Sequence, residues 1–294
     1  MLEFKPLLLE DNAFLETYLK PYSFKTCEYS FTSLFIWRKG CDVKYTTYKN
    51  VLIIIKMDFN KNYHFMQPIG YTKDNLKEII EIMIQYKEEN NFLYLFKDLE
   101  DSFIKEFREI YPDSFEINED IDNFDYIYES SKLITLSGKK LHGKKNHYNN
   151  FIKNNEYRTT PINSENICEC IMAAREWVYK NDSKGYLLFE LEAIEELLKN
   201  RVSLSFDGMA VYVANKLCAF TIGEKINNEM AIIHIEKADS EINGLYAFIN
   251  KTFVETYYSE VPFINREQDL GIEGLRRAKK TYYPFKLEPK YSVK

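Results

Sequence analysis

The pattern of apolar and polar positions predicts the same order of helices and strands twice along the chain. In the first half it predicts, in order, a strand at 5–9, helices at 11–19 and 30–38, strands at 42–47, 51–57 and 63–66, a helix from 72, a strand at 92–96, a helix at 99–110, and strands at 115–118 and 124–129. In the second half it predicts a strand at 157–162, helices from 164 and at 188–199, strands at 209–214, 217–225 and 230–237, a helix at 244–258, a strand at 262–265 and a helix at 271–280. We therefore predict two lobes of mixed α/β structure, residues 1–129 and 130–294, with a basic segment inserted at the start of the second.

Composition narrows the class of protein. With 45% hydrophobic and 29% charged residues, the chain has the composition of a folded soluble protein. A net charge of −6 argues against broad binding to nucleic acid or to an anionic membrane, although it allows a local basic patch. The sequence holds no apolar stretch long enough to span a bilayer. The cysteines show no metal-ligand spacing, so we expect no metal, reduced thiols and a cytoplasmic location.

Residues 265–284 hold the densest cluster of chemically capable side chains. Three of the chain's few arginines lie there, Arg266, Arg276 and Arg277, in a sequence that otherwise prefers lysine. Arginine presents a planar, permanently charged fork that suits carboxylates and phosphates. Gly271 and Gly274 mark places where the backbone takes a positive φ or approaches a ligand. The alternative is a polar loop followed by an ordinary surface helix with its cations near the C-terminal end.

Local motifs carry a resemblance to known families. The order of elements resembles that of GNAT-type acyltransferases, and three motifs resemble the catalytic domain of phosphatidylglycerol lysyltransferases and its soluble relatives. These motifs are LSGKKLHGKKN at 136–146, IHIEKA at 233–238, and NREQDLG at 265–271 with GLRRAK at 274–279. More distantly, residues 274–282 resemble the G-L-x-x-F-K-x-x-F box of Fem peptidyltransferases, with Ala278 in place of phenylalanine. The resemblance implies an α/β fold of two tandem GNAT-like lobes and transfer of an aminoacyl group from tRNA to an acceptor.

The same resemblance implies a cleft in the second lobe. In a GNAT lobe the fourth and fifth strands run parallel and splay apart around the acyl donor, and here these strands are 230–237 and 262–265. His234 and Glu236 are two residues apart on a strand, so we expect them to share a face and to include a proton acceptor for catalysis. The alternative is a core histidine beside an edge-strand carboxylate.

The loop and helix that follow supply further candidates. The predicted substrate-binding residues of the loop are Asn265, Arg266, Glu267 and Asp269. On the helix, Arg276 and Lys279 are three residues apart and share a face, so we predict that one of them stabilises an oxyanion. Replacing Lys279 by Met should then lower transfer about a hundredfold with little change in melting temperature. Surface salt bridges to nearby carboxylates are the rival interpretation.

The basic insert at 139–145 is the only concentrated run of cations. We predict that it binds phosphates of a tRNA acceptor end or of a nucleotide, in a salt-sensitive way. The candidate substrate-binding residues are Lys140, Lys144, Lys145 and Asn146. A solvated helix face is the alternative.

The loop at 239–247 argues against acetyl-CoA in the second lobe. Only Gly244 fits the glycine-rich pattern that holds a diphosphate at a helix N-terminus. Glu241 would repel a diphosphate, and Tyr246 would block close approach of the backbone. In the first lobe, residues 67–72 are nearer to the pattern, but a Pro-Gly turn before a helix explains them equally well.

The sequence therefore predicts an acyl- or aminoacyl-transferase that acts on an amine or hydroxyl. The donor would be aminoacyl-tRNA or acyl-CoA, and the acceptor a small molecule, a peptide or a lipid headgroup. Two alternatives stay open: an acetyl-CoA-dependent N-acetyltransferase of small molecules, and a non-catalytic module that binds a nucleotide or peptide. A shift of the melting temperature by acetyl-CoA or by charged tRNA would separate them.

Overall fold

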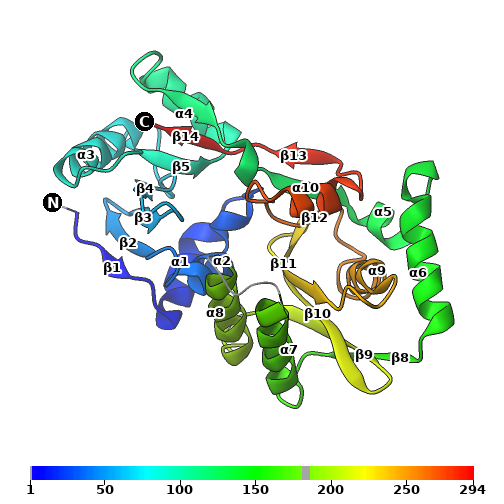
Figure 1. The fold of residues 1–294 in the computed structure, drawn as a ribbon. Coiled ribbons are helices and arrows are strands. Elements are labelled where there is room, and N and C mark those ends of the chain that lie inside the picture. The colour runs from blue at the N-terminus through cyan, green and yellow to red at the C-terminus, as the bar shows by residue number, and fades with distance from the viewer. Residues whose placement is uncertain (1, 181–185) are drawn as a thin grey trace. The chain divides into compact units, whose positions relative to one another are not determined.

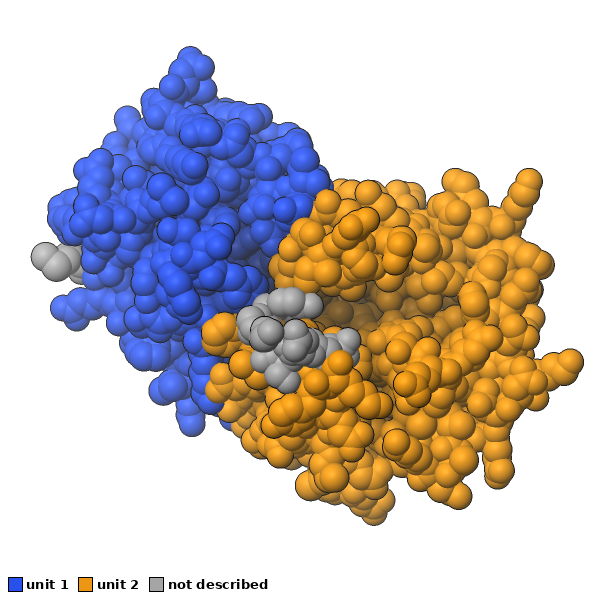
Figure 2. Space-filling view, in the orientation of Figure 1, with its two compact units in different colours: residues 1–124, 288–294 blue, residues 125–287 orange. Residues whose placement is uncertain are grey.

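The computed structural model describes residues 2–180 and 186–294, which fall into two compact units (Figure 2). Unit 1 comprises Met1–Phe124 and Glu288–Lys294, and unit 2 comprises Asp125–Leu287. A seven-stranded sheet lies at the centre of each unit, with helices packed on it (Figure 1).

Unit 1 follows the predicted order of elements closely. Its strands are β1 (Lys5–Pro6), β2 (Lys44–Tyr48), β3 (Val51–Met57), β4 (Tyr63–Phe65), β5 (Phe96–Leu99), β6 (Ile117–Glu119) and β14 (Tyr291–Val293). Its helices are α1 (Asn12–Leu19), α2 (Phe31–Trp37), α3 (Leu76–Glu89) and α4 (Asp101–Ile110). Helix α3 begins later than expected, because the backbone N–H of Thr72 donates to Asn75 Oδ1 at 2.7 Å and closes a turn before the helix.

Unit 2 contains the predicted strands and an additional long helix in the basic insert. Its strands are β7 (Asp125–Glu129), β8 (Tyr157–Pro161), β9 (Asp207–Val213), β10 (Lys216–Lys225), β11 (Met230–Ala238), β12 (Phe263–Asn265) and β13 (Lys286–Glu288). Its helices are α5 (Ser130–Thr135), α6 (His142–Asn154), α7 (Ile167–Lys180), α8 (Tyr186–Lys199), α9 (Leu245–Tyr257) and α10 (Glu273–Lys280). The basic run therefore spans a 3₁₀ turn and the first turn of α6.

The two sheets have corresponding strand orders. The first reads β1-β2-β3-β4-β5-β14-β6, and the second, read from its other edge, β8-β9-β10-β11-β12-β7-β13. In each sheet the fourth and fifth strands pair in parallel and the sixth runs antiparallel to the fifth. The sixth strands are exchanged: β7 ends the first half of the chain but lies in the second sheet, and β14 follows unit 2 but lies in the first. The units thus differ from the expected division at 129/130, because strand patterning does not specify the partner strand.

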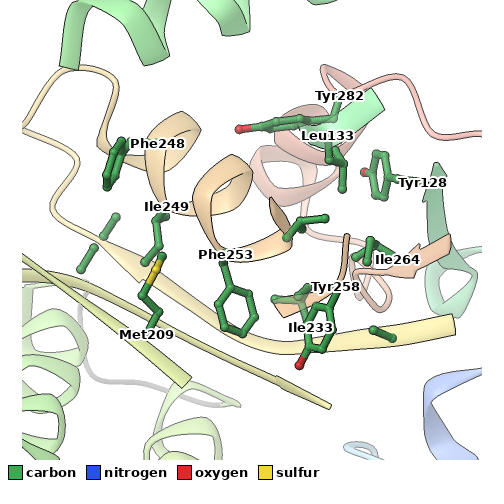
Figure 3. Packing of buried hydrophobic residues seen from close by; sticks show 14 of the residues in the cluster. Tyr128, Leu133, Met209, Ile233, Phe248, Ile249, Phe253, Tyr258, Ile264 and Tyr282 are labelled. Carbon is green, nitrogen blue, oxygen red and sulfur yellow. The ribbon is translucent and has the colours of Figure 1, made fainter. Parts of the chain in front are cut away.

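The core of unit 2 lies between the sheet and α9 (Figure 3). Ile249 of α9 lies against Met209 of β9, and Phe253 lies near Ile233 of β11. Burial of one such side chain contributes about 1.5–3 kcal/mol, so this cluster holds α9 firmly on one face of the sheet. The position of β11 is thereby fixed as well, which matters because the candidate site residues lie on it.

Candidate active site at the splayed strands

β11 and β12 separate in the middle of the second sheet. They pair in parallel, and the last paired residues are Ile232 of β11 and Asn265 of β12. β11 then continues to Ala238, whereas the chain leaves β12 and enters the loop that leads to α10. Figure 2 shows a hollow in the surface of unit 2, at the place where Figure 1 draws these two strands and α9. The two strands therefore part after Ile232 and Asn265, as the predicted splay requires.

A β-bulge in β11 separates the two side chains that were expected to share a face. The register of β10 against β11 shifts between Ile222 and Gly223, which leaves His234 as the extra residue on β11. The alternation of faces is reset across a bulge. The prediction that His234 and Glu236 point the same way is wrong, because a spacing of two residues preserves the face only in a regular strand.

His234 lies between two carboxylates. Its Nδ1 is 2.9 Å from Glu267 Oε1 and its Nε2 is 3.0 Å from Glu224 Oε1, and the ring is fully buried. Burial by itself lowers the pKa of His234, but the hydrogen bonds to Glu224 and Glu267 outweigh it and raise the pKa to about 10. At neutral pH the ring is an imidazolium that donates from both nitrogens. His234 therefore ties β11 to β10 and to the loop after β12, and it has no free lone pair for a substrate proton.

Glu236 faces α9, and each of its carboxylate oxygens accepts a hydrogen bond. Asn250 Nδ2 of α9 donates to Oε2 at 2.9 Å, and Arg266 Nη2 donates to Oε1 at 2.9 Å. Among the residues that the structure describes, Asn250 Oδ1 and Arg266 Nη1 are buried and have no hydrogen-bond partner. Buried polar atoms are almost always paired, so these two atoms mark a place where a bound group would complete the cluster.

Two aromatic rings and a lysine surround the guanidinium of Arg266. Its central carbon lies 4.8 Å from the centre of the Tyr282 ring and 5.5 Å from that of Tyr128. Lys144 of α6 places its ammonium 4.2 Å from the centre of the same Tyr282 ring. Burial and the charge of Arg266 lower the pKa of Lys144, and Glu236 opposes them. The basic insert therefore delivers one cation to the Glu236–Arg266 pair.

The other predicted residues of the insert lie on the solvent side. Lys145 and Asn146 are exposed. Lys140 is also exposed, and its ammonium lies 5.2 Å from the ring centre of Tyr283, itself an exposed residue. The structure thus brings together Lys144 and the residues of the splay, and it leaves the remaining cations of the run on the surface around them.

Asn265 shapes the start of the loop. It is fully buried, its Nδ2 donates to Asp125 Oδ2 at 2.8 Å, and its Oδ1 accepts from the backbone N–H of Glu267 at 2.7 Å. Glu267 has a φ of 56°, in the left-handed region that non-glycine residues seldom occupy. The side chain of Asn265 thus stabilises a tight reversal that turns Arg266 toward Glu236 and Glu267 toward His234.

Asp269 anchors the end of the loop to α10. Its carboxylate accepts from Tyr126 Oη at 2.6 Å, from the backbone N–H of Gly271 at 2.9 Å, and from Arg276 Nε and Nη2, both at 2.8 Å. Burial raises the pKa of Asp269, but these donors, Arg276 first among them, lower it overall. The guanidinium of Arg276 therefore forms a two-bond ion pair with a carboxylate of the same chain, that of Asp269.

Lys279 of α10 also holds the loop between β12 and α10. It is 8% exposed, and its ammonium donates to the backbone carbonyls of Arg266 and of Glu267, the latter at 3.0 Å. The predicted shared face of α10 is confirmed, since Arg276 and Lys279 both reach the loop. Both cations hold the backbone that carries Arg266, and Lys279 does so through bonds to carbonyl oxygens.

Helix α6 covers the N-terminus of α9. Gly244 caps α9 with a φ of +85°, and a Cβ atom built on it would lie 2.0 Å from the backbone oxygen of His147 of α6. His147 Nδ1 also lies 3.2 Å from Asn243 Oδ1 in the same loop. In a GNAT lobe, this helix end would hold the diphosphate of CoA. Glycine is required here because its φ is positive and because two backbones meet.

Sequence reasoning did not identify Asn250, Tyr128, Tyr282 or Glu224. Asn250 is 1% exposed in a helix whose buried stripe is otherwise apolar, and a polar residue within such a stripe is a recognisable signal. Tyr282 occupies the last aromatic position of the Fem-like box. Glu224 and Tyr128 carry no such signal, because their roles depend on strand pairing.

The fold is similar to that of a tandem GNAT protein and of FemX. A tandem GNAT protein from the clavulanic acid biosynthesis pathway matches with a TM-score of 0.51 at 8% identity, over 99% of this chain and 98% of that one. FemX matches with a TM-score of 0.57 at 6% identity, over 99% and 96%. Such identities show the fold alone. The predicted class, mixed α/β structure in two tandem GNAT-like units, is confirmed.

The family described as "Phosphatidylglycerol lysyltransferase, C-terminal" matches residues 19–294, and the chain belongs to it. A conserved protein of unknown function from Bacteroides thetaiotaomicron VPI-5482 is 32% identical, with a TM-score of 0.92 over 100% of this chain and 99% of that one. L-PGS from Bacillus licheniformis has a TM-score of 0.66 at 15% identity, over 96% and 91%. An uncharacterized protein from Mycoplasmoides gallisepticum is 29% identical over 185 residues, which are 60% of this chain and 58% of that protein.

In the described part of the chain, no helix is both long enough and apolar enough to cross a membrane.

Proposed function

We propose that this chain transfers an aminoacyl group from the 3′ ester of a tRNA to an amine or hydroxyl acceptor, in the cleft between β11 and β12. Membership of the lysyltransferase family supports an aminoacyl donor. The observation that carries the proposal is the position of α6. This helix covers the end of α9 at which a CoA diphosphate would bind, and the same helix delivers Lys144 to the Glu236–Arg266 pair.

Glu236 is the proton acceptor in this proposal. The acceptor nitrogen or oxygen attacks the ester carbonyl carbon, its proton passes to the Glu236 carboxylate, and the bond to the ribose oxygen breaks. The same carboxyl group then returns the proton to that oxygen. Asn250 and Arg266 hold the carboxylate in one orientation through its two oxygens.

The remaining predicted residues act by positioning. His234, Asn265, Glu267 and Asp269 shape the loop, while Arg276 and Lys279 fasten it to α10. We assign Lys140, Lys145 and Asn146 to the phosphates of the tRNA acceptor end, because they are exposed next to the cation that enters the cleft.

The test follows the loss of label from tRNA. Bulk tRNA charged with labelled amino acids is incubated with the chain and with separate acceptor pools of small molecules, peptides and lipids, and labelled acetyl-CoA is tested in parallel. We expect label to move from tRNA to one pool, and no transfer from acetyl-CoA. Glu236→Gln should slow transfer about a hundredfold or more, because the proton acceptor is lost.

Glu241→Gln is the matched control, since it removes an exposed carboxylate from the loop that follows β11. It should leave the rate unchanged. Transfer from acetyl-CoA, or full activity of Glu236→Gln, would reject the proposal.

A further inference from the structure

The cluster around Tyr282 contains more positive than negative charge. Lys144 and Arg266 both lie over the ring of Tyr282, at 4.2 and 4.8 Å, whereas among the described residues Glu236 is the one carboxylate bound to either of them. No carboxylate of the described residues lies within salt-bridge distance of Lys144. The side chain of Arg266 is only 13% exposed, so its charge is poorly screened by solvent. A group that binds here therefore meets one uncompensated positive charge.

The hydrogen-bonding capacity of Arg266 also indicates a negatively charged ligand. Its Nη2 is bound to Glu236, and its Nη1 is buried without a partner among the described residues. Nη1 can only donate, so the group that completes it must be an acceptor. Lys144 likewise offers only donors, on the same aromatic ring. Two donors and an excess of positive charge define a site for an oxyanion.

The geometry points to a phosphate subsite formed by Lys144 and Arg266 Nη1 on the ring of Tyr282, beside Glu236. A carboxylate is planar and is best held by both nitrogens of one guanidinium fork, but one of these nitrogens is already bound to Glu236. A phosphate presents oxygens in several directions and suits one guanidinium nitrogen together with the point charge of a lysine.

The inference rests on the proposed function for the source of the phosphate. A phosphodiester could enter with the donor, as the last internucleotide phosphate of a tRNA, or with the acceptor, as the phosphate of a lipid headgroup. Both sources present the same chemistry to Lys144 and Arg266. They differ in the groups that the phosphate joins, and binding experiments can distinguish them.

The experiment is isothermal titration calorimetry on the full chain, which requires no transfer activity. The probes are inorganic phosphate, the dinucleotide cytidylyl-adenosine and the soluble diester glycerophosphoglycerol. We expect one diester to bind more tightly than inorganic phosphate. Tighter binding of the dinucleotide assigns the subsite to the donor, and tighter binding of glycerophosphoglycerol assigns it to the acceptor.

A second lysine of α6 provides the control. Lys144→Met should weaken binding of the preferred diester about tenfold or more, because a charge-assisted bond is lost. Lys153→Met makes the same change at an exposed position near the other end of α6 and should alter binding less than about twofold. Lys144→Arg keeps the charge and should bind as the parent does, which excludes loss of folding as the cause.

Three results would overturn the subsite: no binding of any probe, unchanged binding by Lys144→Met, or equal losses in Lys144→Met and Lys153→Met. Phosphodiester binding without transfer from charged tRNA would reject the proposed function and leave the subsite standing. Transfer from charged tRNA without phosphodiester binding would reject the subsite and leave the proposed function standing.

Discussion

Each unit has a histidine on the fourth strand of its sheet, but the two rings have different neighbours. In unit 1, His64 of β4 lies opposite Lys56 of β3, and its Nε2 is 3.6 Å from Asp98 Oδ2 of β5. Lys56 is 2.8 Å from the same oxygen. Burial lowers the pKa of His64 more than Asp98 raises it, so this ring is neutral at neutral pH.

In unit 2 the corresponding neighbours are both acidic. His234 lies between Glu224 of β10 and Glu267, which follows β12, and it is charged. The acidic residues at the fifth strand share a left-handed backbone, with φ of 57° at Asp98 and 56° at Glu267. The difference therefore comes from the third strand, which supplies a cation in unit 1 and a carboxylate in unit 2. The two units thus place a histidine at the same position of the fold, and the charge of its third-strand neighbour, Lys56 or Glu224, determines whether the ring is neutral or protonated.

The largest effect should come from breaking the ion pair of unit 1. Asp98→Asn leaves Lys56 largely buried beside a neutral partner, and loss of one member of a buried pair costs about 3–5 kcal/mol. Glu267→Gln should cost less, about 1–3 kcal/mol, because His234 keeps Glu224 and can release its proton. Urea unfolding of the intact chain measures both, with exposed Asp113→Asn as the neutral control. A larger loss for Glu267→Gln than for Asp98→Asn would contradict the comparison.

A middle-sized effect should follow from Lys279→Met. The substitution keeps the stem but removes the bonds to two backbone carbonyls next to Glu267, so we expect a loss of about 1–3 kcal/mol and a lower melting temperature. Transfer should also slow, because Arg266 lies in the released loop. This corrects the expectation of an unchanged melting temperature, which assumed a cation in the cleft. Lys280→Met, at an exposed position, is the control, and equal melting of the two variants would refute the holding role.

The smallest effect is a pH dependence of opposite sign in the two units. The pKa of His234 is raised from 6.5 to about 10, so its stabilisation is complete below 6.5 and is lost as the pH rises through 10. The pKa of His64 is lowered, so its neutral ring favours folding above 6.5, and this is lost as the pH falls. Melting temperatures between about pH 5 and pH 10 test this. His234→Gln should flatten the alkaline limb and His64→Gln the acidic limb, and an exchange of the two effects would break the comparison.

Much of the fold could be predicted because the apolar pattern specifies each element locally. The stripe of α3 and the alternation of β11 and β12 needed no partner to be recognised. The bulge at His234 could not be predicted, because it depends on the register with β10. The exchange of β7 and β14 could not be predicted either, because it also depends on which strands pair. In the site, the loop motif indicated Arg266 and Lys279, but their contacts depend on Asn250, Tyr282 and backbone carbonyls that no local pattern connects with them.

The strand exchange has a consequence for synthesis on the ribosome. β14 is made after all of unit 2, so the sheet of unit 1 waits for its sixth strand until unit 2 has been synthesised. During that time β5 and β6 have no strand between them, and their open edges are a hazard for mispairing. Unit 2 has the opposite history, since β7 emerges before the rest of its sheet and can pair with β12 as soon as β12 appears. Most of the sheet of unit 2, from β7 to β12, can therefore form before the sheet of unit 1 is complete, although unit 2 is synthesised second.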